Sequence, residues 1–200
     1  MTAPSTRRAT VESPTQVVLD DERSLVLRGA DDDDLPDVQA LHARCSPTTL
    51  AGRYLAGGRA PSRRLTRALL RTDLALVVTA APGTVVALGN VAGADEDPQV
   101  AELACIVDDD WREKGVEEAL LRQLVAGARL LGYREVVSIA PTTGGWVQQQ
   151  ISRLGPTLLQ RTPFGEAVVR LELAPHHIGL LGRPWAPGRE RVVVSRPGVA

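Results

Sequence analysis

The chain has 200 residues, of which 44% are hydrophobic and 24% charged, a composition typical of one folded domain with room for tails. The formal net charge is −1, so no global positive field would attract nucleic acid or an anionic membrane. No apolar run approaches the roughly 20 residues of a membrane-spanning helix, and the first residues lack the apolar segment of a secretory signal. The two cysteines, Cys45 and Cys105, form neither a zinc-binding spacing nor a disulfide framework, which favours a cytoplasmic location.

Both ends of the chain lack the periodicity of packed elements. Residues 1–16 are rich in Thr, Ser, Pro and Arg and predict a disordered N-terminal tail. Residues 175–200 contain four prolines and four arginines, and they predict an extension rather than a second domain. Within it, the pair His176-His177 has no partner at metal-ligand spacing, so we expect a surface pair and no metal site. One domain is therefore expected over residues 17–174.

The first half of this domain predicts a strand followed by helices. Residues 24–28 are a short strand, and the acidic run Asp31–Asp34 then opens a helix, because aspartates cap free N–H groups and favour the positive end of the helix dipole. The apolar positions of that helix share one face, and His42 is expected at the rim of this face. Ser46–Thr49 breaks and restarts the helix, and residues 62–71 predict another.

The second half predicts a hairpin and then further alternation of strands with helices. Strands over 74–80 and 84–92 are joined by Ala81-Pro82-Gly83, and a third long strand covers 100–107. Residues 116–131 show the clearest amphipathic helix, which Gly132 closes. The remaining predicted elements are a strand over 135–140, a helix over 145–154 and strands over 158–161 and 167–173. The pattern predicts a mixed α/β (α+β) domain with a mostly antiparallel central sheet flanked by helices.

One strand, turn and helix carry the most informative motif. The strand Ala101–Val107 leads through an acidic turn into Arg112-Glu113-Lys114-Gly115-Val116-Glu117 and then into the amphipathic helix. This order resembles the acyl-CoA-binding segment of the GNAT superfamily of N-acetyltransferases, in which Gln/Arg-x-x-Gly-x-Gly/Ala joins a strand ending in Val to a helix. Gly132–Val136 resembles the family's turn into its fifth strand. Cys45–Thr49 with Arg53-Tyr54 is similar to a segment of bacterial protein-lysine acetyltransferases.

The resemblance covers residues 24–173 and implies a GNAT fold and an acetyl-CoA site. The pantetheine arm would lie on the backbone of Cys105, Ile106 and Val107. The pyrophosphate would be held by the turn residues Arg112, Lys114, Gly115, Val116 and Glu117. Such a turn suits a pyrophosphate because its N–H groups converge at the positive end of a helix dipole, and glycines allow close approach.

The turn departs from the family pattern at Glu117, which stands where Gly or Ala is expected. From Asp108 to Glu118 there are six acidic and two basic residues, a local charge of −4. Like charges about 4 Å apart repel by about 1 kcal/mol in water and about 4 kcal/mol at an effective dielectric of 20. In one interpretation the chain's own carboxylates fill the anion site. In the other, Glu117 and Glu118 point to solvent and only stabilise the helix.

Two further residues differ from what the resemblance implies. Thr143 stands where the family carries an Asn near the cofactor, and Ile151 stands where a Tyr protonates the departing thiolate. Glu102, five residues before Val107, matches the general-base glutamate of the protein-lysine acetyltransferases; its alternative is an exposed strand residue. Cys105 is interpreted as a small buried side chain rather than a nucleophile.

These observations leave two functions open. The first is a GNAT-fold pseudoenzyme with lost or weakened acetyl-CoA binding that acts as a regulatory or protein-binding module. The second is an active acetyl-CoA-dependent N-acetyltransferase, acting on a protein lysine or a small-molecule amine with Glu102 as general base. A protein partner could contact the basic face formed by Arg63, Arg67 and Arg71, which recur every four residues, or the C-terminal extension. The alternative for the basic face is a solvated helix surface, and a homodimer is left open.

Overall fold

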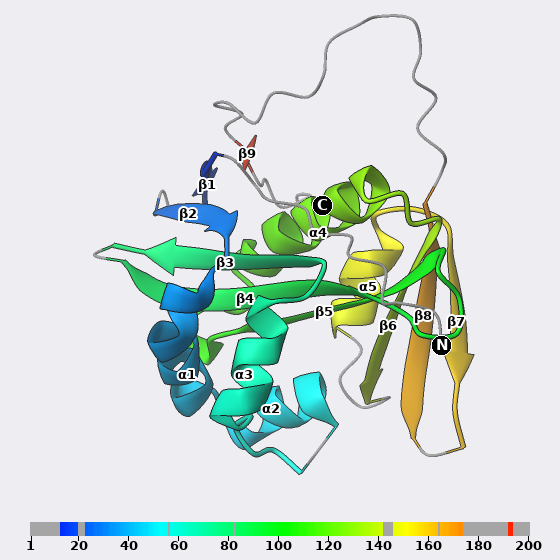
Figure 1. Cartoon of the computed structure of the whole chain (residues 1–200), viewed down its shortest axis with the longest axis horizontal. Coiled ribbons are helices and arrows are strands. Elements are labelled where there is room, and N and C mark those ends of the chain that lie inside the picture. Colours follow the sequence, from blue (N-terminus) through cyan, green and yellow to red (C-terminus); the bar gives the residue numbers. More distant parts are fainter. Residues whose placement is uncertain are drawn as a thin grey trace, which may run out of the picture.

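A single nine-stranded sheet forms the centre of the computed structural model, which describes residues 13–19, 23–55, 57–81, 83–141, 146–163, 165–173 and 192–193. The strand order is β7-β8-β6-β5-β4-β3-β2-β1-β9 (Figure 1). The strands are β1 Thr15–Val18, β2 Ser24–Gly29, β3 Leu74–Ala80, β4 Thr84–Gly93, β5 Val100–Val107, β6 Glu135–Pro141, β7 Thr157–Arg161, β8 Glu166–Glu172 and β9 Val192–Val193. Among these strands, only β5 with β6 and β1 with β9 pair in parallel, which confirms the mostly antiparallel mixed sheet.

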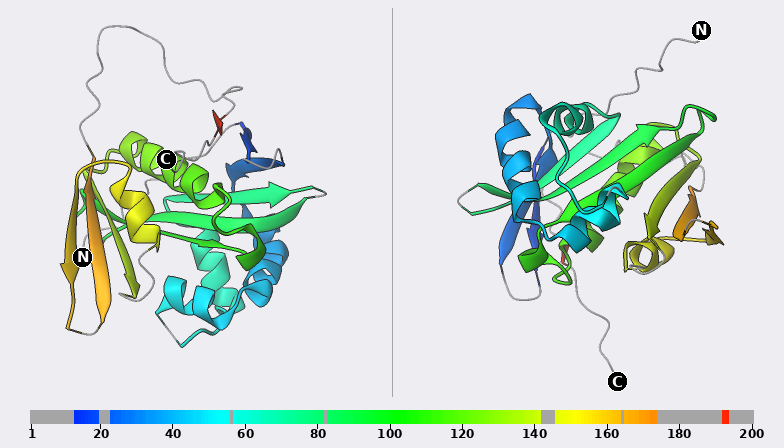
Figure 2. Two further views of the ribbon diagram at one scale, coloured as in Figure 1. Left: turned by 180° about the vertical axis from the view of Figure 1, so that it is seen from behind. Right: turned by 90° about the horizontal axis from the view of Figure 1, so that it is seen from below.

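Helices cover both faces of the sheet (Figures 1 and 2). They are α1 Leu35–Arg44, α2 Pro47–Tyr54, α3 Arg63–Leu70, α4 Val116–Leu130 and α5 Trp146–Ser152, with short 3-10 turns at Asp32–Asp34 and Asp109–Trp111. Helices α1, α2 and α3 bury Leu41, Leu50 and Leu70 in one apolar cluster with strand residues such as Leu88. Helices α4 and α5 pack in the larger cluster on the opposite face. Two buried layers therefore enclose the central strands.

The acidic run before α1 acts as the sequence predicts. Asp31 caps the turn Asp32–Asp34 by accepting a hydrogen bond from the backbone N–H of Asp33 at 2.9 Å. Asp34 is buried and pairs with both terminal nitrogens of Arg28 at 2.6 and 2.8 Å. Although burial opposes ionisation, the hydrogen bonds from Arg28 hold the pKa of Asp34 below its usual value. The run therefore stabilises the helix start and joins it to β2.

Two local features differ from the sequence-based expectations. Strand β1 begins at Thr15, inside the segment 1–16 expected as a tail, because pairing of β1 with β2 supplies the hydrogen bonds that a four-residue segment lacks alone. His42 does not lie at a helix rim, because it is only 1% exposed. Its Nδ1 lies 2.6 Å from the carbonyl oxygen of Val38 and its Nε2 lies 2.5 Å from the hydroxyl oxygen of Tyr54. Tertiary hydrogen bonds thus decide both positions.

The parallel strands β5 and β6 separate after a short paired stretch. Their register ends at Glu102, which lies opposite Val137, although β5 continues to Val107 and stays paired with β4 along its length. Among the described strands, none pairs with β5 beyond Glu102 on the side of β6. The sheet therefore opens into a fork between the ends of these two strands.

Candidate functional site

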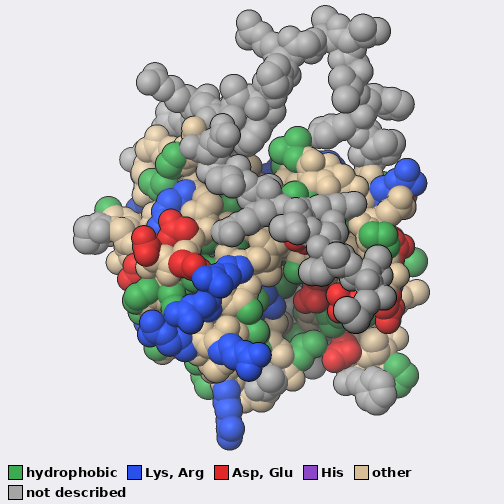
Figure 3. Space-filling view, in the orientation of Figure 1, with side chains coloured by type: hydrophobic (Ala, Val, Ile, Leu, Met, Phe, Trp, Pro, Cys, Tyr) green, Lys and Arg blue, Asp and Glu red, His purple; other side chains and the backbone are tan. Residues whose placement is uncertain are grey.

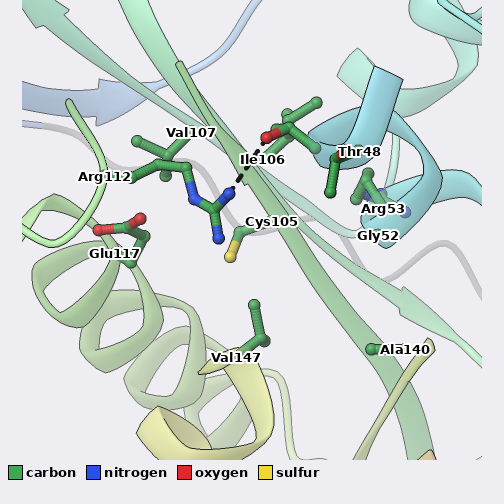
Figure 4. A pocket seen from close by; sticks show the side chains of 11 residues that line it. Thr48, Gly52, Arg53, Cys105, Ile106, Val107, Arg112, Glu117, Ala140 and Val147 are labelled. Carbon is green, nitrogen blue, oxygen red and sulfur yellow. Dashed lines mark hydrogen bonds between the residues drawn. The ribbon is translucent and has the colours of Figure 1, made fainter. Parts of the chain in front are cut away.

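The fork between β5 and β6 contains a pocket of about 110 Å³. Figure 4 shows its walls, which come from β5, β6, α2, α5 and the start of α4. The lining residues are Thr48, Thr49, Gly52, Arg53, Cys105, Ile106, Val107, Arg112, Glu117, Ala140 and Val147. Ligand pockets usually measure about 300–1,000 Å³, so this volume suits a narrow group and not a large ligand in full.

The end of β5 forms the apolar wall of the pocket. Cys105 and Val107 belong to the core beneath α4, whereas Ile106 belongs to the core beneath α1 to α3. All three line the pocket. Their contact with a pantetheine arm stays a prediction from the resemblance. Burial raises the pKa of the Cys105 thiol to about 12, so the thiol stays protonated near neutral pH. Cys105 is therefore a wall residue and not an activated nucleophile.

Glu102 lies where the fork begins, as the last β5 residue paired with β6. Its side chain is exposed and does not line the pocket. Because side chains alternate along a strand, Glu102 shares a face of β5 with Ile106, the face on which α2 lies. A molecule approaching the fork from this face would meet the carboxylate without displacing any core side chain.

The turn between Arg112 and α4 has an unusual backbone. Glu113 has φ +60° and Gly115 has φ +90°, so two residues that are two positions apart adopt left-handed geometry. Gly115 is the N-cap of α4, at a position where a Cβ would be strained. The Nζ of Lys114 donates a hydrogen bond to the backbone carbonyl oxygen of Asp110, within the same loop. The turn thus has the backbone shape of an anion-binding loop. The ammonium group of Lys114, however, is already hydrogen-bonded to the backbone of that loop.

Glu117 is turned into this loop and is only 3% exposed. Burial raises the pKa of its carboxyl group to about 7. Hydrogen bonds from the backbone N–H groups of Glu117 and Glu113, and the nearby charge of Arg112, favour the ionised form and keep the pKa from rising further. The Oε2 atom is buried and has no hydrogen-bond partner among the described residues. Of the two sequence-based interpretations, the geometry therefore favours the one in which Glu117 fills the loop.

Arg112 points across the pocket toward α2 (Figure 4). Its Nη1 donates a hydrogen bond to Oγ1 of Thr49 at 3.2 Å and lies 4.0 Å from Oδ1 of Asp109. Asp109 in turn accepts hydrogen bonds from the Thr49 hydroxyl at 2.6 Å and from the backbone N–H of Ser46 at 2.6 Å. These contacts tie the turn before α4 to the start of α2. The guanidinium predicted to hold a pyrophosphate is therefore engaged with the protein.

The other sequence-predicted positions contribute indirectly or lie outside the described residues. Lys114, Gly115 and Val116 do not line the pocket, and Val116 is fully buried in the core as the first residue of α4. Ile151 is buried in the core at 1% exposure, and its aliphatic side chain has no proton to donate to a thiolate. Thr143 and the pair His176-His177 lie outside the described residues.

Helix α2 contributes pocket residues that motif reasoning assigned no role. Thr48, Thr49 and Gly52 line the pocket, and Ser46 caps the helix by accepting a hydrogen bond from the backbone N–H of Thr49. Arg53 donates a long hydrogen bond of 3.4 Å to Oδ1 of Asn90, and its buried Nε has no partner among the described residues. The capping pattern of Ser46–Thr49 predicts a helix start in the sequence, and this was the available indication that a helix could lie beside the pocket.

The basic face expected on α3 is only partly free. Arg63 and Arg67 are exposed, and Figure 3 shows basic side chains gathered over the region of α1 to α3. Arg71, however, pairs with Asp32 through two contacts of 2.6 and 3.0 Å. Any partner of this face would therefore meet Arg63 and Arg67 first.

Neither a metal-binding cluster nor a membrane-spanning helix is present in the part of the chain that the structure describes. It contains no cluster of three or more His, Cys, Asp or Glu side chains placed to hold a metal ion. None of its helices combines the length and the apolar character that crossing a bilayer requires.

Comparison with known proteins identifies the fold. No family model matches the sequence, and no curated protein matches it. Among solved structures, the GNAT domain of PAT from S. lividans is 21% identical over 80% of this chain and 97% of its own, with a TM-score of 0.71. A GNAT superfamily phosphinothricin acetyltransferase from Sinorhizobium meliloti, solved in complex with acetyl-CoA, is 19% identical over 74% of this chain and 88% of its own, with a TM-score of 0.63.

A third similar structure is the cAMP-binding acyltransferase from Mycobacterium smegmatis, which is 21% identical with a TM-score of 0.56. The match covers 82% of this chain but 48% of that longer protein. With the mixed sheet, the helices on both faces and the fork between β5 and β6, these similarities show that the chain has the fold of the GNAT superfamily of N-acetyltransferases.

Proposed function

We propose that this chain is a GNAT-fold, acetyltransferase-like protein with weakened acetyl-CoA binding, acting as a regulatory or protein-binding module. One observation carries the proposal: the carboxyl group of Glu117 is buried in the turn that would hold the pyrophosphate and accepts hydrogen bonds from that turn's own N–H groups. An ionised carboxylate in this position repels a pyrophosphate and competes for the same donors.

The two ends of the pocket differ in how well they suit acetyl-CoA. The end formed by Cys105, Ile106 and Val107 fits a narrow neutral arm, because the β5 backbone there is not paired with β6. The turn before α4 does not fit a pyrophosphate while Glu117 is ionised, because an anion would lie against a buried carboxylate oxygen that has no partner. Acetyl-CoA binding is therefore expected to be weakened at its charged end.

Partner binding would then use surfaces away from the fork. The exposed Arg63 and Arg67 of α3 suit an acidic protein surface, because neither arginine is paired with a carboxylate among the described residues. The C-terminal extension, residues 175–200, is the other candidate contact region.

Calorimetric titration with acetyl-CoA tests the weakened binding. Glu117→Gly removes both the charge and the bulk of the side chain, whereas Glu117→Gln removes only the charge. We expect both variants to bind acetyl-CoA at least about tenfold more tightly than the wild type at pH 8, since about 1.4 kcal/mol of relieved repulsion corresponds to a factor of ten. Lowering the pH to 6 should tighten wild-type binding, because protonation neutralises Glu117, and should change the variants less.

Micromolar binding of acetyl-CoA by the wild type at pH 8, unchanged in Glu117→Gln, would contradict the proposal. If only Glu117→Gly gains affinity, then bulk and not charge closes the turn.

An active N-acetyltransferase is the second candidate, and the position of Glu102 favours it. Its exposed carboxylate lies at the start of the fork, on the face of the sheet that carries α2, where an acceptor amine could approach. Glu102 would take a proton from the ammonium group of the acceptor, directly or through water.

A transfer assay with amine acceptors tests this second function. Glu102→Gln is expected to lower kcat/KM about 100-fold or more, the contribution typical of a general base. Glu172→Gln, an exposed strand glutamate on β8, serves as the matched control. Equal activity of the two variants would remove Glu102 from the mechanism, and absence of transfer by the wild type would remove the second candidate.

A further inference from the structure

In the loop before α4, the cationic side chains and the backbone N–H donors that could bind a pyrophosphate already have partners within the protein. Lys114 donates to the carbonyl oxygen of Asp110, and Arg112 is engaged with Thr49 and lies near Asp109. The N–H groups of Glu113 and Glu117 face the carboxylate of Glu117. A pyrophosphate entering the turn would have to displace each of these contacts, and it would bring further negative charge to a segment of net charge −4.

Arg44, a further cation near this loop, is also held in an ion pair. Arg44 on α1 lies beside the same loop, and its Nε donates a hydrogen bond to Oδ2 of the buried Asp108 at 2.8 Å. Its Nη2 donates to the carbonyl oxygen of Val85 at 2.7 Å. Arg44 is therefore not available to compensate for the charge of Glu117.

The part of the fork away from this loop is mostly apolar. Its walls include Val107, Ala140 and Val147, and Figure 4 shows Val147 of α5 pointing toward the space beside Cys105. Beyond Glu102, the β5 edge that faces β6 has no strand partner among the described residues. An extended chain that carries amide groups can pair with such an edge in the way that an added strand does. Both the shape and the polarity suit a narrow, neutral, amide-bearing arm.

From this contrast we infer that the fork takes a thioester arm without a pyrophosphate: an acyl-pantetheine or acyl-phosphopantetheine group, free or attached to a carrier protein. The inference rests on the weakened acetyl-CoA binding proposed above. The pantetheine part of such an arm is uncharged and has the same amides and thioester as acetyl-CoA, so it would make the same contacts with β5. Pantetheine has no phosphate, and a phosphopantetheine arm has one where coenzyme A has a pyrophosphate and a 3′-phosphate, so Glu117 repels either arm less than it repels coenzyme A. Glu117 then acts as a specificity residue that selects against coenzyme A and leaves the thioester end of the pocket open.

Titrations of the wild type with S-acetyl-pantetheine and with acetyl-CoA at pH 8 test this selection. S-acetyl-pantetheine is expected to bind at least about tenfold more tightly than acetyl-CoA, a difference of about 1.4 kcal/mol. In Glu117→Gln and Glu117→Gly the preference should disappear or reverse. Glu118→Gln is the matched control, because Glu118 lies on the same helical turn but forms a surface pair with Arg122 at 2.7 Å. This control should keep the wild-type preference.

Two outcomes separate the failure of this inference from the failure of the proposed function. If acetyl-CoA binds weakly and S-acetyl-pantetheine binds no more tightly, the selection is overturned while the weakened acetyl-CoA binding stands. If the wild type binds acetyl-CoA tightly, the proposed function fails first. A preference that survives in both Glu117 variants would also overturn the role of Glu117.

A second comparison identifies the source of the arm. The acetylated arm of an acyl carrier protein is compared with free S-acetyl-4′-phosphopantetheine, and the carrier protein without its arm gives the background. Tighter binding of the carrier-linked arm assigns the donor to a carrier protein. Equal binding of the two assigns it to the free thioester.

Discussion

Replacing Glu117 by Gln is expected to stabilise the protein increasingly as the pH rises, by about 2–3 kcal/mol more at pH 8 than at pH 5. The folded protein raises the pKa of this carboxyl group to about 7 because the group is buried, whereas its ordinary value is 4.5. Between these two values the folded state binds more protons than the unfolded state, so the stability of the wild type falls as the pH rises. Below pH 4.5 the buried group is neutral in both states and carries no such cost.

Chemical denaturation of the wild type and Glu117→Gln at pH 5, 6, 7 and 8 measures this difference. Glu118→Gln controls for a carboxylate on the same turn that is not buried in the loop. A pH-independent difference between the wild type and Glu117→Gln would mean that Glu117 is solvated in the folded protein. That result would also weaken the argument that it occupies the anion site.

The packing of α4 on β4 carries the other large expected effect. A Cβ added at Gly89 would lie 2.6 Å from Cδ1 of Leu124 and 3.0 Å from Cγ of Leu120, closer than van der Waals contact allows. Gly89→Ala is therefore expected to lower the free energy of unfolding by about 1–3 kcal/mol through overpacking. Leu124→Ala, at a fully buried position, is expected to cost about 2–5 kcal/mol through lost burial and the cavity it leaves.

The double variant separates this close contact from general destabilisation. With Leu124 shortened, the methyl group of Ala at position 89 fills part of the cavity, so the combined loss should be smaller than the sum of the single losses by at least about 1 kcal/mol. Denaturant unfolding of the four proteins measures this coupling. Gly52→Ala is the control for adding a methyl group, because no atom lies within 4 Å of a Cβ built there and the residue is helical. Additive losses would show that α4 does not rest on Gly89.

This close packing bears on the site as well as on stability. Gly89 allows α4 to approach the sheet, and α4 begins at Val116, directly after the turn that carries Arg112 and Gly115. The depth at which the helix packs therefore determines where Glu117 lies relative to the end of β5. A substitution that moves α4 outward would be expected to change ligand binding at the fork without touching it.

The order and type of most elements follow from local patterns in the sequence. Strands β3 and β5 have the bounds that their apolar runs predict, and α4 has the expected start at Val116, because hydrophobic periodicity and turn residues act over short stretches. The turn motif from Arg112 to Glu117 also identified Glu117 as the residue that departs from the GNAT pattern. Strand β1 escaped this reasoning because four residues carry too little periodicity, and only its pairing with β2 makes it a strand.

Contacts between segments that are distant in the sequence decided how the side chains of the candidate site are oriented and paired. The sequence predicted the acidic character of the loop and left the orientation of Glu117 open, since a helix-start glutamate can equally face solvent. Its burial follows from how α4 packs against the sheet beside β5. Likewise, Arg112 contacts Thr49, 63 residues earlier, only because the folded sheet brings α2 beside the loop. The fold class and the unusual turn could be predicted from the amino-acid sequence, because element order and a short motif are both visible in local patterns. Tertiary structure alone decided which charges in that turn are buried and which are paired, because these depend on neighbours supplied by other elements.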